Sequence, residues 1–160
     1  MSTPILPLFR RLSSKPGGKW LFSRLVCLKA PYFASIAPRM ELLEPGRAVA
    51  TLRHRRAVTN HLGTVHAIAL CNLAEFVGGL TCDVTIPRDM RWIPKSMQVE
   101  YLAKAIGPMT ATARPLAEAR MATGGYALPF EVVIVNATGE TVFRAVIDMW
   151  ISPKQGRKPR

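Results

Sequence analysis

The chain has 160 residues, 49% of them hydrophobic and 20% charged, so its length and composition favour a single domain with a sizeable core. Its formal net charge of +12 is confined to the ends: residues 1–40 hold seven Lys or Arg and no acid, residues 154–160 hold four more, and residues 41–153 hold eleven against ten acids. Basic ends are more typical of solvated segments than of a nucleic-acid surface, so we do not expect nucleic acid as a partner.

The remaining composition narrows the class of protein. No apolar run reaches about 18 residues, so no transmembrane helix is expected. Cys27, Cys71 and Cys82 are odd in number and lack a Cys-x-x-Cys spacing, which argues against a disulfide framework and favours a cytoplasmic protein. The three histidines of residues 54–66 have no carboxylate or cysteine at a ligand spacing, so no metal is expected.

The N-terminal region separates into two parts. Residues 1–15 are predicted to be a basic tail, in which the arginines follow a Pro-broken apolar stretch, the reverse of a secretory signal. The acid-free residues 1–40 also fit a mitochondrial-type leader, an alternative that does not arise in a bacterial protein. After the breaker at residues 16–18, residues 19–29 read KWLFSRLVCLK and predict an amphipathic helix. Packing against its own sheet is the favoured interpretation, and contact with an anionic membrane surface is the alternative.

A short strand is predicted at residues 48–53, after the turn signal of residues 44–46. Arg53, Arg55 and Arg56 follow it and form the strongest basic cluster in the body of the chain. The cluster is either a solvated loop or an anion-binding site, and composition does not choose between them.

The most informative segment is residues 65–80, which read VHAIALCNLAEFVGGL and predict an apolar helix. Gly63 supplies a turn and Thr64 a candidate N-cap hydroxyl, so the helix is expected to begin near Val65 or His66. Glu75 is the only charge in this run. Because burying an unpaired carboxylate is costly, its position indicates a function rather than packing.

The helix geometry limits what one chain can do. The free backbone N–H groups at a helix start suit an oxyanion or a polarised carbonyl. At a rise of about 1.5 Å per residue, Glu75 lies roughly 13 Å along the axis from His66, too far for both to act on one atom. A two-fold dimer with antiparallel helices would bring Glu75 of one chain near the helix start of the other.

The remainder of the chain predicts a sheet. Strands are expected at residues 95–103 and 110–114, and residues 130–135 and 141–151 form the clearest hairpin. One long helix with one strand before it and four after it is an α+β order. Residues 153–160 are predicted to be a basic C-terminal tail.

Residues 60–75 resemble the motif of hotdog-fold acyl-CoA thioesterases of the PaaI-like group, which reads Asn, five residues, His-Gly-Gly, then a carboxylate nine residues after the His. Asn60, His66 and Glu75 match its three polar positions, and Ala67 stands at its first Gly. The longer stretch of residues 16–151 is similar to a poorly characterised hotdog family with an additional N-terminal helical segment.

That resemblance implies an α+β hotdog fold in residues 16–152, with a long central helix wrapped by a curved antiparallel five-stranded sheet and an additional N-terminal helix. It further implies a homodimer or a dimer of dimers, and thioester hydrolysis at the dimer interface. No cofactor is implied beyond the coenzyme A of the substrate.

The resemblance also implies a role for each matching residue. Glu75 would be a general base or a nucleophile, the N–H of Ala67 would bind the thioester oxygen, Asn60 would position the water or the carboxylate, and His66 would support the loop or the carbonyl. Arg53, Arg55 and Arg56 lie close enough in sequence to meet the phosphates of coenzyme A.

Two departures from the motif keep other functions open. His-Gly-Gly is replaced by His66-Ala67-Ile68, and Glu75 stands where many members have Asp. Rival hypotheses are an acyl-CoA hydratase or dehydratase, which generally pairs a His and an acid at a different spacing, and a non-catalytic acyl-CoA-binding or membrane-peripheral protein.

Overall fold

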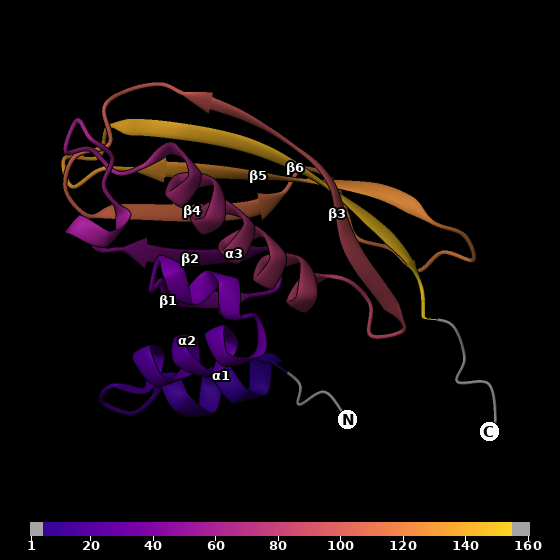
Figure 1. Cartoon of the computed structure of the whole chain (residues 1–160). Helices are drawn as coiled ribbons and strands as arrows, with labels where there is room; N and C mark the ends of the chain where they lie inside the picture. The colour runs from indigo at the N-terminus through magenta and orange to yellow at the C-terminus, as the bar shows by residue number, and fades with distance from the viewer. Residues whose placement is uncertain (1–4, 155–160) are drawn as a thin grey trace.

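The central element of the computed structural model, which describes residues 5–154, is a long helix lying across one face of an antiparallel sheet (Figure 1). The elements in chain order are α1 (Ile5–Ser13), α2 (Gly18–Lys29), the 3-10 turn η1 (Pro31–Ser35), β1 (Arg39–Glu44), β2 (Arg47–Leu52), the 3-10 turn η2 (Arg56–Val58), α3 (Ala67–Thr85), β3 (Met90–Tyr101), β4 (Met109–Pro115), β5 (Tyr126–Val135) and β6 (Thr141–Pro153).

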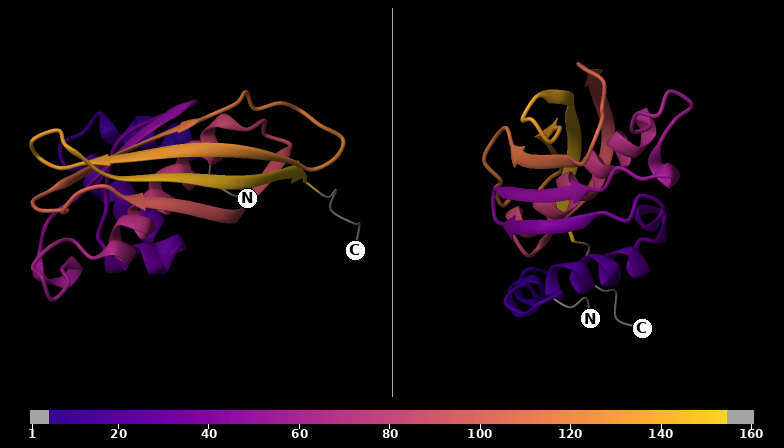
Figure 2. Two further views of the ribbon diagram at one scale, coloured as in Figure 1. Left: turned by 90° about the horizontal axis from the view of Figure 1, so that it is seen from above. Right: turned by 90° about the vertical axis from the view of Figure 1, so that its left-hand side faces the viewer.

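The six strands are ordered β1-β2-β4-β5-β6-β3, and every neighbouring pair is antiparallel. The strand that follows α3 in sequence, β3, crosses to the far edge and pairs only with β6. The edges are therefore β1 and β3, and the sheet curves around α3 between them (Figure 2). This is an α+β hotdog fold, as the sequence predicts.

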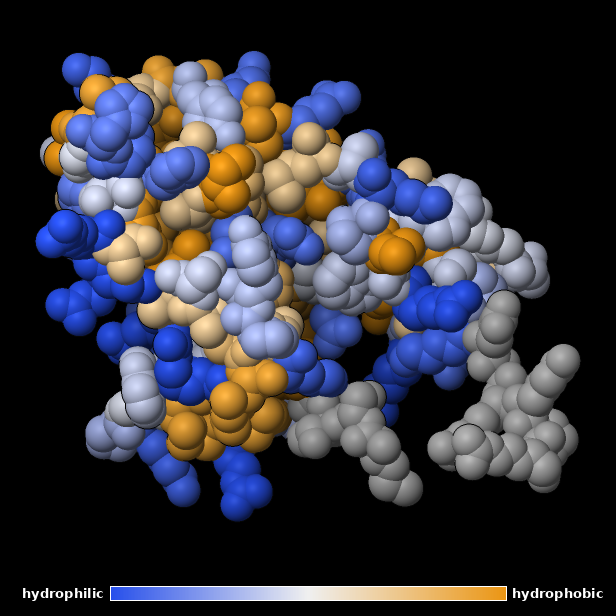
Figure 3. Space-filling model, in the orientation of Figure 1, coloured by the Kyte–Doolittle hydropathy of each residue, from blue (hydrophilic) through white to orange (hydrophobic). Residues whose placement is uncertain are grey.

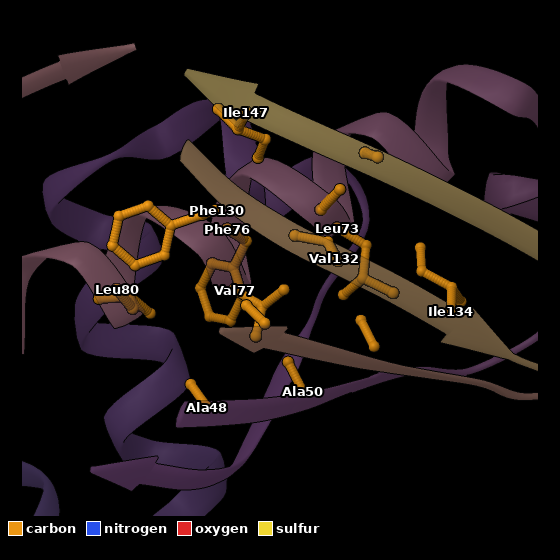
Figure 4. Packing of buried hydrophobic residues seen from close by; sticks show 14 of the residues in the cluster. Ala48, Ala50, Leu73, Phe76, Val77, Leu80, Phe130, Val132, Ile134 and Ile147 are labelled. Carbon is orange, nitrogen blue, oxygen red and sulfur yellow. The ribbon is translucent and has the colours of Figure 1, made fainter. Parts of the chain in front are cut away.

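The core lies between α3 and the concave face of the sheet. Alternate residues of β5 are buried, as the period of two in a strand requires when one face is covered. Side chains of α3, β5 and β6 interdigitate here, among them Leu73, Phe76, Val77, Phe130 and Ile147 (Figure 4).

Two consecutive glycines let the helix approach the sheet closely. A Cβ added at Gly78 would lie 3.0 Å from the Ile147 side chain, and one at Gly79 would lie 2.8 Å from the Trp92 ring. Glycine weakens a helix interior, so these positions trade helix propensity for closer packing.

The N-terminal helices form a layer beside β1. The rings of Phe9 and Phe22 pack edge to face at 5.0 Å, and the buried Ser23 hydroxyl accepts a hydrogen bond from the Met40 N–H of β1 at 2.8 Å. The predicted packing of residues 19–29 against their own domain is confirmed. Part of the segment expected as a tail, residues 5–13, is instead the helix α1 with Phe9 buried, and residues 1–4 lie outside the described part of the chain.

The expected strand count of five was wrong, because residues 5–154 form a sheet of six strands. The strand that the sequence did not predict is β1, which reads RMELLE. Its pairing with β2 shifts register between Met40 and Leu42, and such a bulge removes the apolar-polar alternation by which strands are recognised. The predicted C-terminal tail overlaps the end of β6 at residue 153 and from residue 155 lies outside the described residues.

The sequence expectation of no membrane-length apolar segment also needs correction. By length and mean hydropathy α3 is long and apolar enough to cross a membrane, but 67% of its apolar window is buried inside the protein. The sheet curves around one side of this helix and buries most of it, so α3 is the core helix of the fold.

We predict that Phe76 joins the N-terminal segment to the core. Phe76 is fully buried and packs edge to face against Phe33 of η1, with ring centroids 5.3 Å apart. Phe76→Ala should lower the free energy of unfolding by about 3–5 kcal/mol. In a urea-denaturation double-mutant cycle with Phe33→Ala, the aromatic pair should contribute a coupling of about 0.5–1.5 kcal/mol. Fully additive losses would show that η1 does not pack on α3 in solution.

Candidate functional site

The start of α3 is capped by the histidine of the motif. His66 has extended backbone dihedrals, and its Nδ1 accepts a hydrogen bond from the Ile68 N–H at 3.1 Å. The expected cap was Thr64, but the Thr64 hydroxyl instead accepts a hydrogen bond from the Asn60 side chain at 2.9 Å. The helix therefore begins at Ala67, and since Nδ1 of His66 accepts, a neutral ring carries its proton on Nε2.

This capping leaves one backbone donor open. The His66 carbonyl accepts from the N–H groups of Ala69 and Leu70, and the ring accepts from Ile68. Within residues 5–154 the Ala67 N–H has no hydrogen-bond partner. A free N–H at the positive end of a helix is suited to bind an anion or a polarised carbonyl oxygen.

Asn60 shapes the loop that leads into α3. Its Oδ1 accepts from the N–H groups of Leu62 at 3.0 Å and Thr64 at 3.2 Å, and Gly63 takes a left-handed conformation with φ of 74°. The amide of Asn60 is thus engaged within its own loop. Its predicted contact with water or with the carboxylate stays a prediction.

A second histidine, which sequence analysis considered only for a metal, fixes this loop from outside. Nδ1 of His54 accepts from the Gly107 N–H at 3.0 Å, so its Nε2 donates to the Gly63 carbonyl at 3.1 Å. The Val65 N–H also donates to the Ala105 carbonyl at 2.8 Å. The described residues contain no group of three His, Cys, Asp or Glu that could hold a metal ion. His54 is therefore a loop-positioning residue.

Glu75 lies on the partly exposed strip of α3, between β3 and the N-terminal segment. Its side chain has no hydrogen-bond or ion-pair partner among residues 5–154, and it is partly accessible. The helix is continuous from Ala67, so eight residues separate the free N–H from Glu75, about 12 Å along the axis. One chain does not bring these two groups together.

One wall of this strip is a seam between α3 and β3. The Cys71 thiol and the Tyr101 hydroxyl lie 3.3 Å apart, one helical turn before Glu75. That hydrogen bond, followed by burial, raises the pKa of Tyr101 to about 12, so the phenol is neutral at physiological pH. Tyr101 therefore brings no negative charge next to the carboxylate. Sequence analysis placed Tyr101 within the predicted strand of residues 95–103 but did not connect it with the site.

The other wall comes from the N-terminal segment. Asn72 donates to the Ser35 hydroxyl at 3.2 Å, and its Oδ1 is buried without a partner among the described residues. Arg55 donates to the Ser35 carbonyl at 3.0 Å. All three arginines predicted to form one anion site are exposed, but only Arg55 is attached to η1; the side chains of Arg53 and Arg56 have no hydrogen-bond partner among residues 5–154.

Comparison with known proteins places this arrangement in a family. The family model described as "Domain of unknown function (DUF4442)" matches residues 18–151. No curated protein matches the chain. The crystal structure of the structural-genomics protein APC5556 is 43% identical, with a TM-score of 0.78 over 94% of this chain and 99% of that one.

More distant structures share the fold. A thioesterase family protein from Silicibacter pomeroyi is 15% identical, with a TM-score of 0.70 over 82% of this chain and 96% of that one. The protein smu.793 from Streptococcus mutans, bound to acetyl CoA, is 18% identical, with a TM-score of 0.62 over 73% of this chain and 90% of that one. At these identities the similarity shows the fold alone.

We predict that the cap made by His66 stabilises α3 independently of any chemistry. His66→Ala should lower the free energy of unfolding by about 0.5–2 kcal/mol, the usual cost of losing an N-cap acceptor, whereas His66→Asn should retain most of the stability. His61→Ala is the matched control, because His61 is exposed and makes no hydrogen bond within residues 5–154. If urea midpoints of His66→Ala and His61→Ala coincide, the ring does not cap the helix.

Proposed function

The chain belongs to the DUF4442 family and has the hotdog fold of thioesterase family proteins, and we propose that it is an acyl-CoA thioesterase. One observation carries the proposal: within residues 5–154, α3 holds a backbone N–H at Ala67 and a carboxylate at Glu75 that both lack a hydrogen-bond partner. Acyl transfer requires these two groups, a donor for the carbonyl oxygen and a base or nucleophile. The acetyl CoA bound to the Streptococcus mutans neighbour supports the same ligand class.

Each complete site would combine two chains, because Ala67 and Glu75 are far apart on one rigid helix. The edge strand β3 is the surface through which we propose that they pair. Among residues 5–154 it pairs only with β6, and eight of its twelve residues are exposed, including Ile93 and Tyr101 at 57% and 51%. A long exposed edge with apolar side chains is a template for pairing with another strand. Antiparallel β3–β3 pairing about a two-fold axis would join two sheets and place two α3 helices side by side.

In this dimer the thioester carbonyl would accept a hydrogen bond from Ala67 of the partner subunit. Glu75 would take a proton from water as the water oxygen attacks the carbonyl carbon, or it would attack that carbon itself and form a mixed anhydride that water then hydrolyses. In both routes the C–S bond breaks, coenzyme A leaves as a thiolate that is protonated, and the acyl group leaves as a carboxylic acid.

The nucleotide part of the substrate would lie near the start of α3. Arg53 and Arg56 are exposed on the chain just before the motif loop, and their guanidinium groups suit phosphate. Arg55 is already bonded to η1, so we assign the phosphate contacts to the other two and a positioning role to Arg55.

A non-catalytic acyl-CoA-binding protein is the second candidate, and one observation favours it. Ile68, which replaces a glycine of the thioesterase motif, is 55% exposed next to the Ala67 donor. A side chain larger than glycine at this position would narrow the approach of a ligand to that N–H. Turnover separates the candidates, because a binder raises its melting temperature with acyl-CoA but releases no free thiol.

The first functional prediction concerns Glu75. Glu75→Gln keeps shape and removes the base, so kcat on a panel of short, long and aromatic acyl-CoA thioesters should fall by at least about 100-fold, with stability unchanged or improved. Asp83→Asn is the matched control, since Asp83 lies on the same helix and accepts a hydrogen bond from Trp92 at 3.3 Å; it should retain parental turnover. A Glu75→Gln variant with parental kcat would exclude Glu75 as the catalytic carboxylate.

The second functional prediction concerns the shared site. Ala67→Pro removes the N–H at a helix position that tolerates proline. Purified heterodimers of Ala67→Pro with Glu75→Gln hold one intact site and one doubly damaged site, so they should show about half the parental kcat, measured by thiol release.

The control places both substitutions in one chain, paired with an unmodified chain. If each site uses two chains, both sites of this heterodimer are damaged and it should be inactive. Half activity in the control, together with none in the first heterodimer, would place the site within a single chain.

A further inference from the structure

The outer face of α2 carries an apolar stripe that the fold does not bury. Leu21, Leu25 and Leu28 are spaced by four and three residues, so they share one helix face, and they are 42%, 39% and 78% exposed. Trp20 and Tyr32 extend it at 58% and 70%. Of the fourteen exposed large hydrophobic residues in the described part of the chain, five thus lie within thirteen positions. Such clustering indicates an interaction surface, whereas scattered single residues would not.

The stripe is not a core face turned outward by a loosely held helix. The opposite face of α2 is fixed by Phe22, which is fully buried against Phe9, and by Ser23, which accepts from the Met40 N–H. Lys19 pairs with Glu41 at 3.2 Å, and Arg24 donates to the Pro38 carbonyl at 3.2 Å. These contacts fix the rotation of the helix, so the leucines stay directed away from the sheet.

The surroundings of the stripe are basic. Residues 5–35 contain six Lys or Arg and no carboxylate. Four of these cations are exposed and have no ion-pair partner among residues 5–154: Arg10, Arg11, Lys15 and Lys29. In the space-filling view, apolar side chains gather over the α1–α2 layer with basic side chains around them (Figure 3). The layer lies beside β1, at the opposite sheet edge from β3 (Figure 1), and is therefore separate from the proposed pairing edge.

We propose that the α2 stripe, Leu21, Leu25 and Leu28 with Trp20 beside them, docks on a bilayer that contains anionic lipids. The cations complement the phosphate headgroups, and the leucines can bury themselves in the apolar layer beneath. A bilayer with anionic lipids supplies both contacts at one surface. At 12 residues α2 is about 18 Å long, too short to span a bilayer, so it lies in the plane of the interface. Tryptophan is enriched at that depth.

The charge pattern disfavours two other occupants. A second copy of the chain docked on the same face about a two-fold axis would bring cations against cations, with no acid in residues 5–35 to pair with them. A nucleic acid would satisfy the cations but would leave the leucines against a phosphate backbone. This inference does not depend on the proposed thioesterase activity.

The test is flotation of the full-length protein with vesicles of pure phosphatidylcholine and of phosphatidylcholine mixed with phosphatidylglycerol. The protein should float only with the anionic vesicles, and should detach in part as salt rises. Leu25→Gln/Leu28→Gln keeps every charge and should reduce the partition coefficient by about tenfold or more, since both leucines lose their apolar contact with the bilayer. The matched control, Ile106→Gln/Leu116→Gln, changes two residues that are 57% and 50% exposed elsewhere, and should bind as the parent does.

A spectroscopic readout places the contact at α2. Anionic vesicles should shift the tryptophan emission to the blue, and this shift should disappear in Trp20→Phe and persist in Trp150→Phe. Binding to anionic vesicles that Leu25→Gln/Leu28→Gln leaves unchanged would show attraction by charge alone and would overturn the proposal. Light scattering gives a second contrary outcome. If the parent protein forms a larger assembly than Leu25→Gln/Leu28→Gln and does not bind vesicles, the stripe is an interface between copies and the proposal is overturned.

Discussion

The packing of α3 against the curved sheet is the constraint on which the rest of the structure depends. Gly78 and Gly79 allow the closest approach, against Ile147 and Trp92, and the buried side chains on both sides of these glycines fix the rotation of the helix. Because the rotation is fixed, only a narrow strip of α3 reaches the surface. Glu75 lies on that strip, and at its start lies the Ala67 N–H, which has no partner among residues 5–154. A rigid helix therefore separates the two groups that acyl transfer would need together, and this separation is the physical basis for a site made of two chains.

A set of hydrogen bonds in the preceding loop fixes the conformation of the N-terminal end of α3. His54, Asn60 and His66 each use their side chains to hold backbone groups of residues 60–68 or of the neighbouring loop at Gly107. Most hydrogen bonds of these polar side chains thus fix the conformation of the loop before α3. What they leave unpartnered within the described residues is one backbone N–H at the positive end of a helix, where an oxyanion is best stabilised. Preorganised donors of this kind need no rearrangement during a reaction.

The N-terminal layer of α1, α2 and η1 is an addition to the central helix and its sheet. Its inner contacts, Phe33 on Phe76 and Ser35 with Asn72 and Arg55, close one side of the strip that carries Glu75. Its outer face carries leucines among cations. One short segment therefore packs against the candidate site on one side and exposes an apolar, basic face on the other.

The sequence by itself determined the elements whose residues repeat at the period of their structure. The helix around Glu75, the strands of residues 48–53 and 110–114 and the hairpin of residues 130–151 were predicted correctly, because a face that packs on one core must be apolar at regular spacing. The motif of residues 60–75 gave the positions of Asn60, His66, Ala67 and Glu75, since spacing along one chain is a property of sequence.

Only the tertiary structure decided the features that depend on distant contacts. The strand β1 was missed because a bulge removes its alternation, and α1 was assigned to a tail because its burial depends on Phe22. The cap at His66, the loop contacts of His54 and the Cys71–Tyr101 seam join atoms whose proximity no local pattern encodes. Sequence patterns report which face of a segment avoids water, while hydrogen bonds between side chains far apart in the chain are fixed only when that burial has positioned both partners.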